Sequence, residues 1–96
     1  MKVRFTPGGR IQFLAALEYI RQARPSPARA FRKKAERILK RLEKFPESER
    51  AIPEFPDLPY REVIVPPYRF FFRPEGRNVW IVAVRHSAQL PDQSSP

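Results

Sequence analysis

The side chains best suited to chemistry gather in the second half of this 96-residue chain. Cleaving RNA without a metal ion needs a base for the 2′-hydroxyl, an acid for the leaving oxygen, and cations for the crowded phosphate. Arginine suits the last role because its planar fork binds two phosphate oxygens at once. His86 is the single histidine and can act as an acid or a base near neutral pH. The other candidates are the arginines Arg61, Arg69, Arg73 and Arg85 and the carboxylates Glu54 and Glu62.

Each of these residues also has a purely structural interpretation. Arg61 and Glu62 can form a cross-strand ion pair, which stabilises little if it is exposed. Arg69 can anchor the fold by binding backbone carbonyls. His86 can be a capping or surface residue. The sequence alone leaves both interpretations open for each residue.

A basic surface in the first half of the chain is the second candidate. The net charge is +9; residues 1–50 carry 14 Lys and Arg against 5 Asp and Glu, whereas residues 51–96 carry 5 against 5. This excess indicates an acidic partner, either nucleic acid or an acidic protein segment, although a solvated helical face would give the same pattern. The cations predicted to bind the target or partner are Arg29, Lys33, Arg37, Lys40 and Arg41, joined by Arg61, Arg73 and Arg85.

Composition excludes several other classes of function. There are no cysteines, so disulfide and thiolate chemistry are excluded. One histidine and scattered carboxylates do not suit a zinc site, so we predict no metal and no cofactor. No apolar run approaches the roughly 18–20 residues that span a bilayer, and the first residues lack the apolar core of a signal peptide. We therefore expect a cytoplasmic protein with no membrane partner.

Two helices are expected to carry the basic surface. A short strand at residues 2–5 precedes Thr6 and Pro7, a capping residue followed by proline, although two glycines favour a helix start nearer Arg10. The apolar stripe of this first helix comprises Phe13, Leu14, Leu17 and Ile20, and Pro25 ends the helix. Ser26 and Pro27 repeat the capping signal for a second helix, which continues to Pro46. The apolar face of this second helix comprises Phe31, Ala35, Ile38, Leu42 and Phe45.

Three strands are expected to carry the candidate chemistry. A proline-rich connector at residues 46–59 precedes strands at residues 60–65, 68–73 and 78–86, and residues 74–77 form a turn with a glycine available for positive φ. Tyr68, Phe70 and Phe72 share one strand face and are predicted to be core, as is Trp80. Residues 79–84 are continuously apolar, which predicts a central strand covered on both faces.

The predicted fold is therefore α+β in two layers, with the order β-α-α-β-β-β. The helical hairpin should pack on one face of a small, mostly antiparallel sheet. We expect residues 1–88 to form a single domain and residues 89–96 to form a polar, frayed tail.

Seven short segments lie at the joints of these elements in a characteristic order. They are residues 3–7, 17–20, 25–28 and 42–46, followed by Tyr60-Arg61-Glu62-Val63-Ile64-Val65, Tyr68-Arg69-Phe70-Phe71-Phe72-Arg73 and Ile81-Val82-Ala83-Val84-Arg85-His86. In this order and spacing the chain resembles the RelE/ParE toxin superfamily of type II toxin–antitoxin systems over nearly its whole length. Its long, uninterrupted helical hairpin resembles the ParE-like branch.

The resemblance implies a toxin that a cognate antitoxin holds inactive by draping over it. In this superfamily the RelE-like branch cuts messenger RNA on the ribosome, and the ParE-like branch inhibits DNA gyrase. Glu54, Arg69 and His86 fall roughly where some ribosome-dependent nucleases of the superfamily place a catalytic glutamate, arginine and histidine. Those nucleases often carry a tyrosine near the end of the last strand, and residues 87–89 here contain none.

The sequence therefore favours a gyrase inhibitor, with a ribosome-dependent mRNA endonuclease as the alternative. A non-toxic nucleic-acid-binding module is a third hypothesis, although no groove-reading motif stands out. A toxin that keeps the fold but has lost its activity is a fourth.

Overall fold

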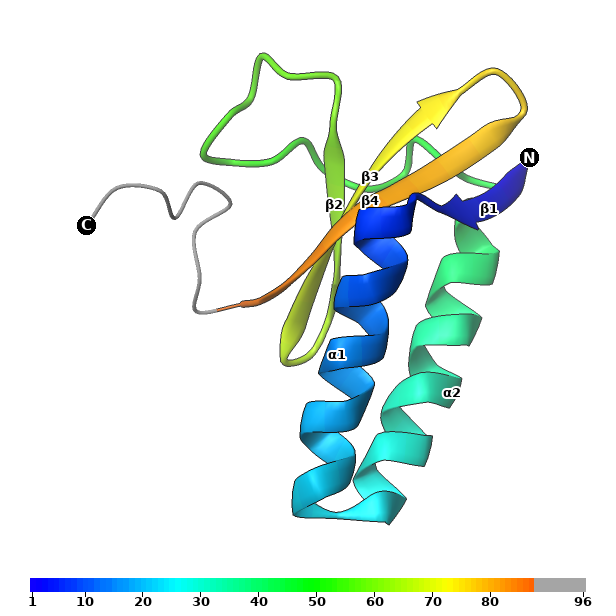
Figure 1. The fold of residues 1–96 in the computed structure, drawn as a ribbon. Coiled ribbons are helices and arrows are strands. Elements are labelled where there is room, and N and C mark those ends of the chain that lie inside the picture. Colours follow the sequence, from blue (N-terminus) through cyan, green and yellow to red (C-terminus); the bar gives the residue numbers. More distant parts are fainter. Residues whose placement is uncertain (88–96) are drawn as a thin grey trace.

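Two helices pack against a four-stranded mixed sheet (Figure 1). The computed structural model describes residues 1–87, apart from the side chain of Pro25, so the tail predicted at 89–96 lies outside the described residues. Within residues 1–87, no helix is both long and apolar enough to cross a bilayer. The elements are β1 (Lys2–Phe5), α1 (Pro7–Ala23), α2 (Pro25–Leu42), β2 (Arg61–Val65), β3 (Tyr68–Glu75) and β4 (Asn78–His86).

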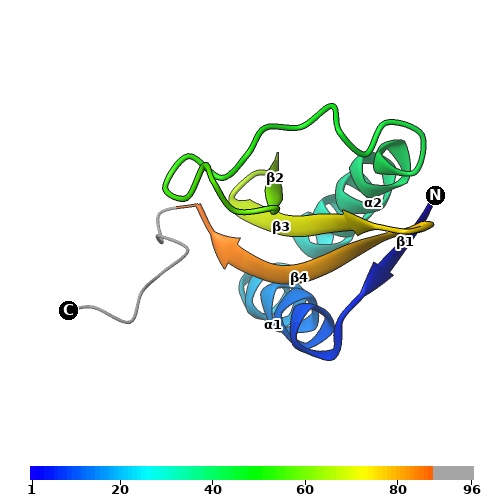
Figure 2. The same ribbon diagram turned by 90° about the horizontal axis from the view of Figure 1, so that it is seen from above.

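The sheet has the strand order β1-β4-β3-β2, which confirms the predicted α+β class. β4 pairs in parallel with β1 and antiparallel with β3, and β3 pairs antiparallel with β2. Seen from above, α1 lies on the side of β4 and α2 on the side of β3 (Figure 2). The turn between β3 and β4 uses Gly76 at φ 60°, so the predicted positive φ is confirmed.

β4 is an interior strand as predicted, but it is not covered on both faces. Its burial alternates, with Val79 and Ile81 buried against the helices and Trp80 only half-buried. The prediction that Trp80 belongs to the core is therefore wrong. The doubly covered strand is β3, where every residue from 68 to 72 is buried. The helices cover one face of β3, and ion pairs from residues of the connector reach its other face.

The first helix begins earlier than its glycines suggested. Thr6 caps it, with its Oγ1 accepting from the Gly9 N–H at 3.0 Å, and Pro7 is the first helical residue. The prediction of a start near Arg10 is wrong because Gly9 serves packing. A Cβ at Gly9 would lie 2.3 Å from the Ile81 carbonyl oxygen, so only glycine allows α1 to approach β4 this closely.

The second helix also differs from the expectation at both ends. It starts at Pro25 after Arg24, which provides no side-chain cap, so the cap predicted at Ser26 is wrong. It ends at Leu42, four residues before Pro46, and a turn follows. A single residue therefore separates the two helices, which run side by side as the predicted antiparallel hairpin (Figure 1).

The core lies between the hairpin and one face of the sheet. Phe13 contacts Phe70 edge-on at 5.7 Å between ring centroids, and Phe31 contacts Tyr68 in the same way at 5.5 Å. The core prediction for Tyr68, Phe70 and Phe72 is confirmed. Two residues assigned to apolar helix faces lie outside the core, since Leu14 is 51% exposed and Phe45 is 58% exposed.

Candidate functional site

Arg69 lies on the sheet face away from the helices and is held between two carboxylates. Its Nε donates to Glu62 Oε1 at 2.8 Å, while its Nη1 and Nη2 donate to Glu54 at 3.1 and 2.8 Å. Arg50 donates from Nε to the other oxygen of Glu62 at 2.6 Å. Arg69 and Glu62 are both buried, at 6% and 1% exposure, so this is an internal ion network rather than a surface pair.

The contact between Arg69 and Glu54 shifts the pKa of both groups. The hydrogen bonds from Arg69 hold the pKa of Glu54 below its usual value, although partial burial opposes the shift. The same bonds, with those to Glu62, raise the pKa of Arg69. Both shifts favour the charged forms of Glu54 and Arg69 at neutral pH. A phosphate would have to displace a carboxylate from the Arg69 fork, which makes this arginine poorly placed for substrate binding.

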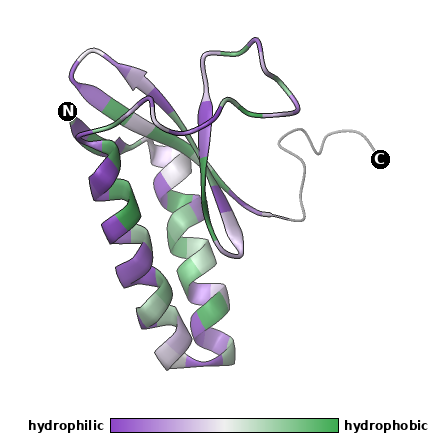
Figure 3. Ribbon diagram, turned by 180° about the vertical axis from the view of Figure 1, so that it is seen from behind, coloured by the Kyte–Doolittle hydropathy of each residue, from purple (hydrophilic) through white to green (hydrophobic). Residues whose placement is uncertain are grey.

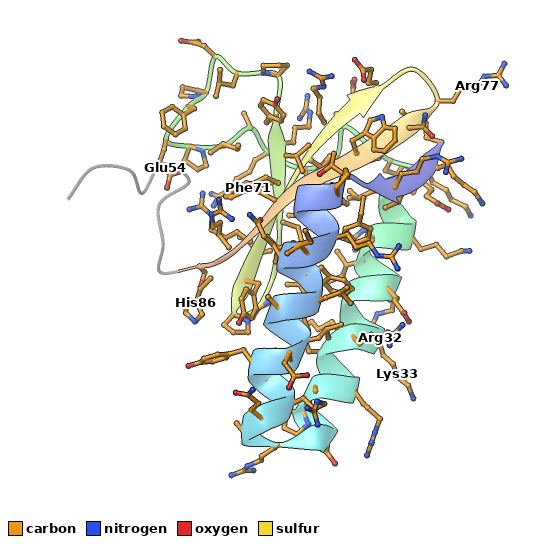
Figure 4. The ribbon with its side chains drawn as sticks, viewed as in Figure 1. Arg32, Lys33, Glu54, Phe71, Arg77 and His86 are labelled. Carbon is orange, nitrogen blue, oxygen red and sulfur yellow. The ribbon has the colours of Figure 1, made fainter. Side chains whose placement is uncertain are left out.

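His86 lies at the end of β4 and on the other side of the sheet from Arg69. It pairs with Tyr68, with ring centroids 5.5 Å apart, whereas Arg69 pairs with Arg85. Successive strand residues point to opposite faces, so Arg69 and His86 diverge. Figure 4 shows Glu54 and His86 well separated. Of the three residues that the resemblance grouped as catalytic, the structure brings Glu54 and Arg69 together and directs His86 elsewhere.

The other sheet arginines also have structural partners. Arg61 donates to the Glu49 carbonyl at 2.6 Å, and Glu62 binds Arg50 and Arg69. Arg61 and Glu62 therefore do not form the ion pair that their sequence allowed. Arg73 pairs with Glu75 at 2.7 Å. Arg85 borders a groove of about 630 Å³ beside α1, which His86, Tyr68 and Tyr19 also line.

The predicted basic surface is present on the outer side of α2. Every cation assigned to it is exposed, and Arg32 and Lys33 point away from the body of the protein in Figure 4. Within residues 1–87, the cations of α2 form two ion pairs, Arg32 with Glu36 at 3.3 Å and Arg41 with Glu49 at 3.6 Å. The predicted residues on this surface are Arg29, Lys33, Arg37, Lys40 and Arg41.

An apolar groove between the two helices is a candidate surface that the sequence interpretation missed. It has a volume of about 640 Å³, and Ile11 and Leu14 line it with exposures of 67% and 51%. Its other lining residues are Ala15, Leu17, Glu18, Arg21, Ala28, Arg29 and Arg32. The α1 ribbon shows hydrophobic colour over much of its length, while α2 carries strongly hydrophilic bands (Figure 3). Ile11 was the signal for this groove in the sequence. It is an apolar residue of the first helix that lies outside the apolar stripe predicted to face the core.

Comparisons with known proteins agree with this fold. A family model described as the ParE toxin of the type II toxin–antitoxin system parDE matches residues 3–91. A solved structure of the chromosomal ParDE toxin–antitoxin system from P. aeruginosa is similar in fold, with a TM-score of 0.70 and 17% identity. The alignment covers 90% of this chain and 95% of that one. No curated protein sequence matches the chain. Because the family model spans nearly the whole chain, the protein belongs to the ParE toxin family of type II toxin–antitoxin systems.

Proposed function

We propose that this toxin inhibits DNA gyrase by binding, without catalysing a reaction, and that a cognate antitoxin neutralises it. The observation that carries the proposal is the state of Arg69. A nuclease would need this guanidinium free for the phosphate of its substrate, and here Glu54 and Glu62 occupy it. The exposed basic surface of α2, in contrast, is suited to binding a large acidic partner.

The groove between α1 and α2 is the proposed docking site of the antitoxin. Ile11, Leu14 and Leu17 offer the apolar contacts that an amphipathic segment needs, and Arg21, Arg29 and Arg32 border the groove. Apolar anchors surrounded by arginine favour a partner with apolar residues on one face and acidic residues beside them.

Pulse labelling after tightly controlled induction in bacteria tests the proposal. DNA synthesis should collapse first while protein synthesis continues, and the purified toxin should block DNA supercoiling by gyrase. Reversing two charges with Lys33→Glu and Arg37→Glu should abolish toxicity while the fold remains intact. The matched control is Arg77→Glu, because Arg77 is equally exposed but lies in the distant β3–β4 turn (Figure 4). Full toxicity of the double variant would refute the role of α2.

A ribosome-dependent mRNA endonuclease is the second candidate, because two of the three residues that the resemblance grouped as catalytic, Glu54 and Arg69, lie together. Under this alternative, protein synthesis stops first, and His86→Ala removes toxicity. Glu54, Arg69 and His86 would then be the residues to test in a cleavage assay on translating ribosomes.

A further inference from the structure

Within residues 1–87, most of the acidic residues that form ion pairs bind arginines outside α2. Glu54 and Glu62 bind the arginines of the sheet, and Glu75 binds Arg73. Within residues 1–87, Arg29, Lys33, Arg37 and Lys40 form no ion pair. With Lys34, which also forms none, they make α2 the element of residues 1–87 with the most cations outside ion pairs.

These four cations, Arg29, Lys33, Arg37 and Lys40, form a single line that we call the α2 basic stripe. They follow one another at steps of four, four and three residues, so they share one face of a helix with about 3.6 residues per turn. That face is opposite the buried side of α2, where Phe31, Ala35 and Leu42 enter the core. Glu36 lies beside the stripe, but Arg32 engages it. At about 1.5 Å per residue, the stripe is roughly 17 Å long.

The chemistry of the stripe suits nucleic-acid phosphates better than a protein surface. Protein interfaces depend on buried apolar or aromatic anchors, and the exposed positions of α2 carry charged residues, Ser26, Pro27 and Ala30. Phosphate contacts need no such burial, because their free energy comes largely from the release of condensed counterions. A 17 Å length of duplex presents about ten phosphates, at one per roughly 1.7 Å.

Single-stranded nucleic acid fits less well. Its binding sites combine basic grooves with aromatic rings on which bases stack. None of the exposed side chains of α2 in the described structure is aromatic. The exposed Phe45, which follows the helix and shares a groove with Arg37 and Lys40, offers a single ring, whereas successive stacked bases need several. Phosphate contacts alone position a protein on a duplex without reading its sequence.

We propose that the α2 basic stripe binds the phosphate backbone of duplex DNA, independently of sequence, and so places the toxin on DNA that gyrase holds. The inference rests on the proposed inhibition of gyrase and names the second partner in that complex. Lys33, Arg37 and Lys40 do not line the apolar groove, and Arg29 is the one stripe residue that borders both surfaces.

The test measures the affinity of the toxin for a fluorescein-labelled 24-base-pair duplex between 50 and 200 mM salt. Four phosphate contacts predict a slope of about −3.6 in log K against log salt, which corresponds to a loss of about 150-fold in affinity over this range. Lys33→Gln with Lys40→Gln should reduce the slope to about −1.8 and the loss to about 12-fold. Arg77→Gln, the matched control, should leave both values unchanged.

The same variants are then compared in the gyrase supercoiling assay. The double variant should inhibit gyrase much more weakly than the wild type, while Arg77→Gln should inhibit it equally. The inference is overturned if the double variant keeps the wild-type salt slope or inhibits gyrase as strongly as the wild type. Loss of antitoxin binding by the double variant, with unchanged duplex affinity, would also overturn it and assign the stripe to the antitoxin. If the wild type binds the duplex with the expected slope but does not inhibit gyrase, the proposed function fails and the DNA-binding stripe is retained.

Discussion

Replacing Arg69 with methionine should strongly destabilise the fold. The substitution keeps the unbranched stem but leaves Glu62, whose side chain is fully buried, with Arg50 as its remaining partner in the network. Removing one member of a buried ion pair costs about 3–5 kcal/mol, and the surviving contact to Arg50 favours the lower end of that range. A domain of this size has a free energy of unfolding of roughly 5–14 kcal/mol, so the loss is a large fraction of the total.

Urea unfolding followed by the fluorescence of Trp80, the single tryptophan, measures this effect. A loss of about 3 kcal/mol corresponds to a fall in Tm of roughly 12–24 °C. The control is Arg73→Met, which removes a pair whose side chains are 37% and 60% exposed and should cost less than about 1 kcal/mol. A similar, small loss for both variants would refute the conclusion that Arg69 stabilises the fold through buried carboxylates.

A double substitution separates this structural role from a catalytic one. Glu62→Leu with Arg69→Met removes both buried charges, and replacing a buried pair by apolar residues is often neutral or stabilising. The double variant should recover most of the stability lost in Arg69→Met. It should also inhibit bacterial growth if Arg69 only supports the fold, whereas a nuclease that needs Arg69 would remain inactive when folded.

The remaining predictions concern packing, His86 and acid stability. Gly9→Ala should destabilise by about 1–3 kcal/mol in urea unfolding, because its Cβ meets the Ile81 carbonyl at 2.3 Å, while Gly8→Ala, with nothing within 4 Å, should be neutral or stabilising. His86→Ala should keep full growth inhibition in a plating assay, and loss of toxicity would favour the nuclease alternative. The pKa of Glu54 is lowered in the folded state, so its contribution to stability is present above its unfolded pKa of about 4.3 and is lost as pH falls through the folded pKa. Acid unfolding should therefore be steeper for the wild type than for Glu54→Gln, and equal steepness would contradict this assignment.

The sequence predicts the helices and strands well because their signals are local. The proline and capping residues, the 3.6-residue apolar period and the turn glycine each act over a few residues. The errors arose where distant contacts decide the outcome. The start of α1 depends on how closely Gly9 approaches β4, more than 70 residues away along the chain. The parallel pairing of β1 with β4 likewise joins the two ends of the described chain.

The ion network could be predicted only in part. The sequence identified Glu54, Glu62 and Arg69 as candidates. Glu54 lies in the connector, which has no hydrophobic periodicity, so the sequence did not show that this segment lies against the sheet. Glu62 points to the face of β2 opposite the core residues Val63 and Val65. If that face of the sheet were open to solvent, Glu62 would be exposed, so the strand pattern alone does not predict its burial. Arg50 was not a candidate, and its contact with Glu62 depends on the path of the connector.

The connector and α2 are held to the core in different ways. The connector lacks a continuous apolar face, and ion pairs such as Glu54 with Arg69 join it to the sheet. α2 is held by apolar contacts through Phe31, Ala35 and Leu42, so its outward charges are not needed for folding. Substitutions in the α2 basic stripe should therefore change binding without changing stability. A single substitution in the network around Arg69 can abolish toxicity simply because the protein unfolds. Only the double variant, Glu62→Leu with Arg69→Met, distinguishes a loss of activity from a loss of folding.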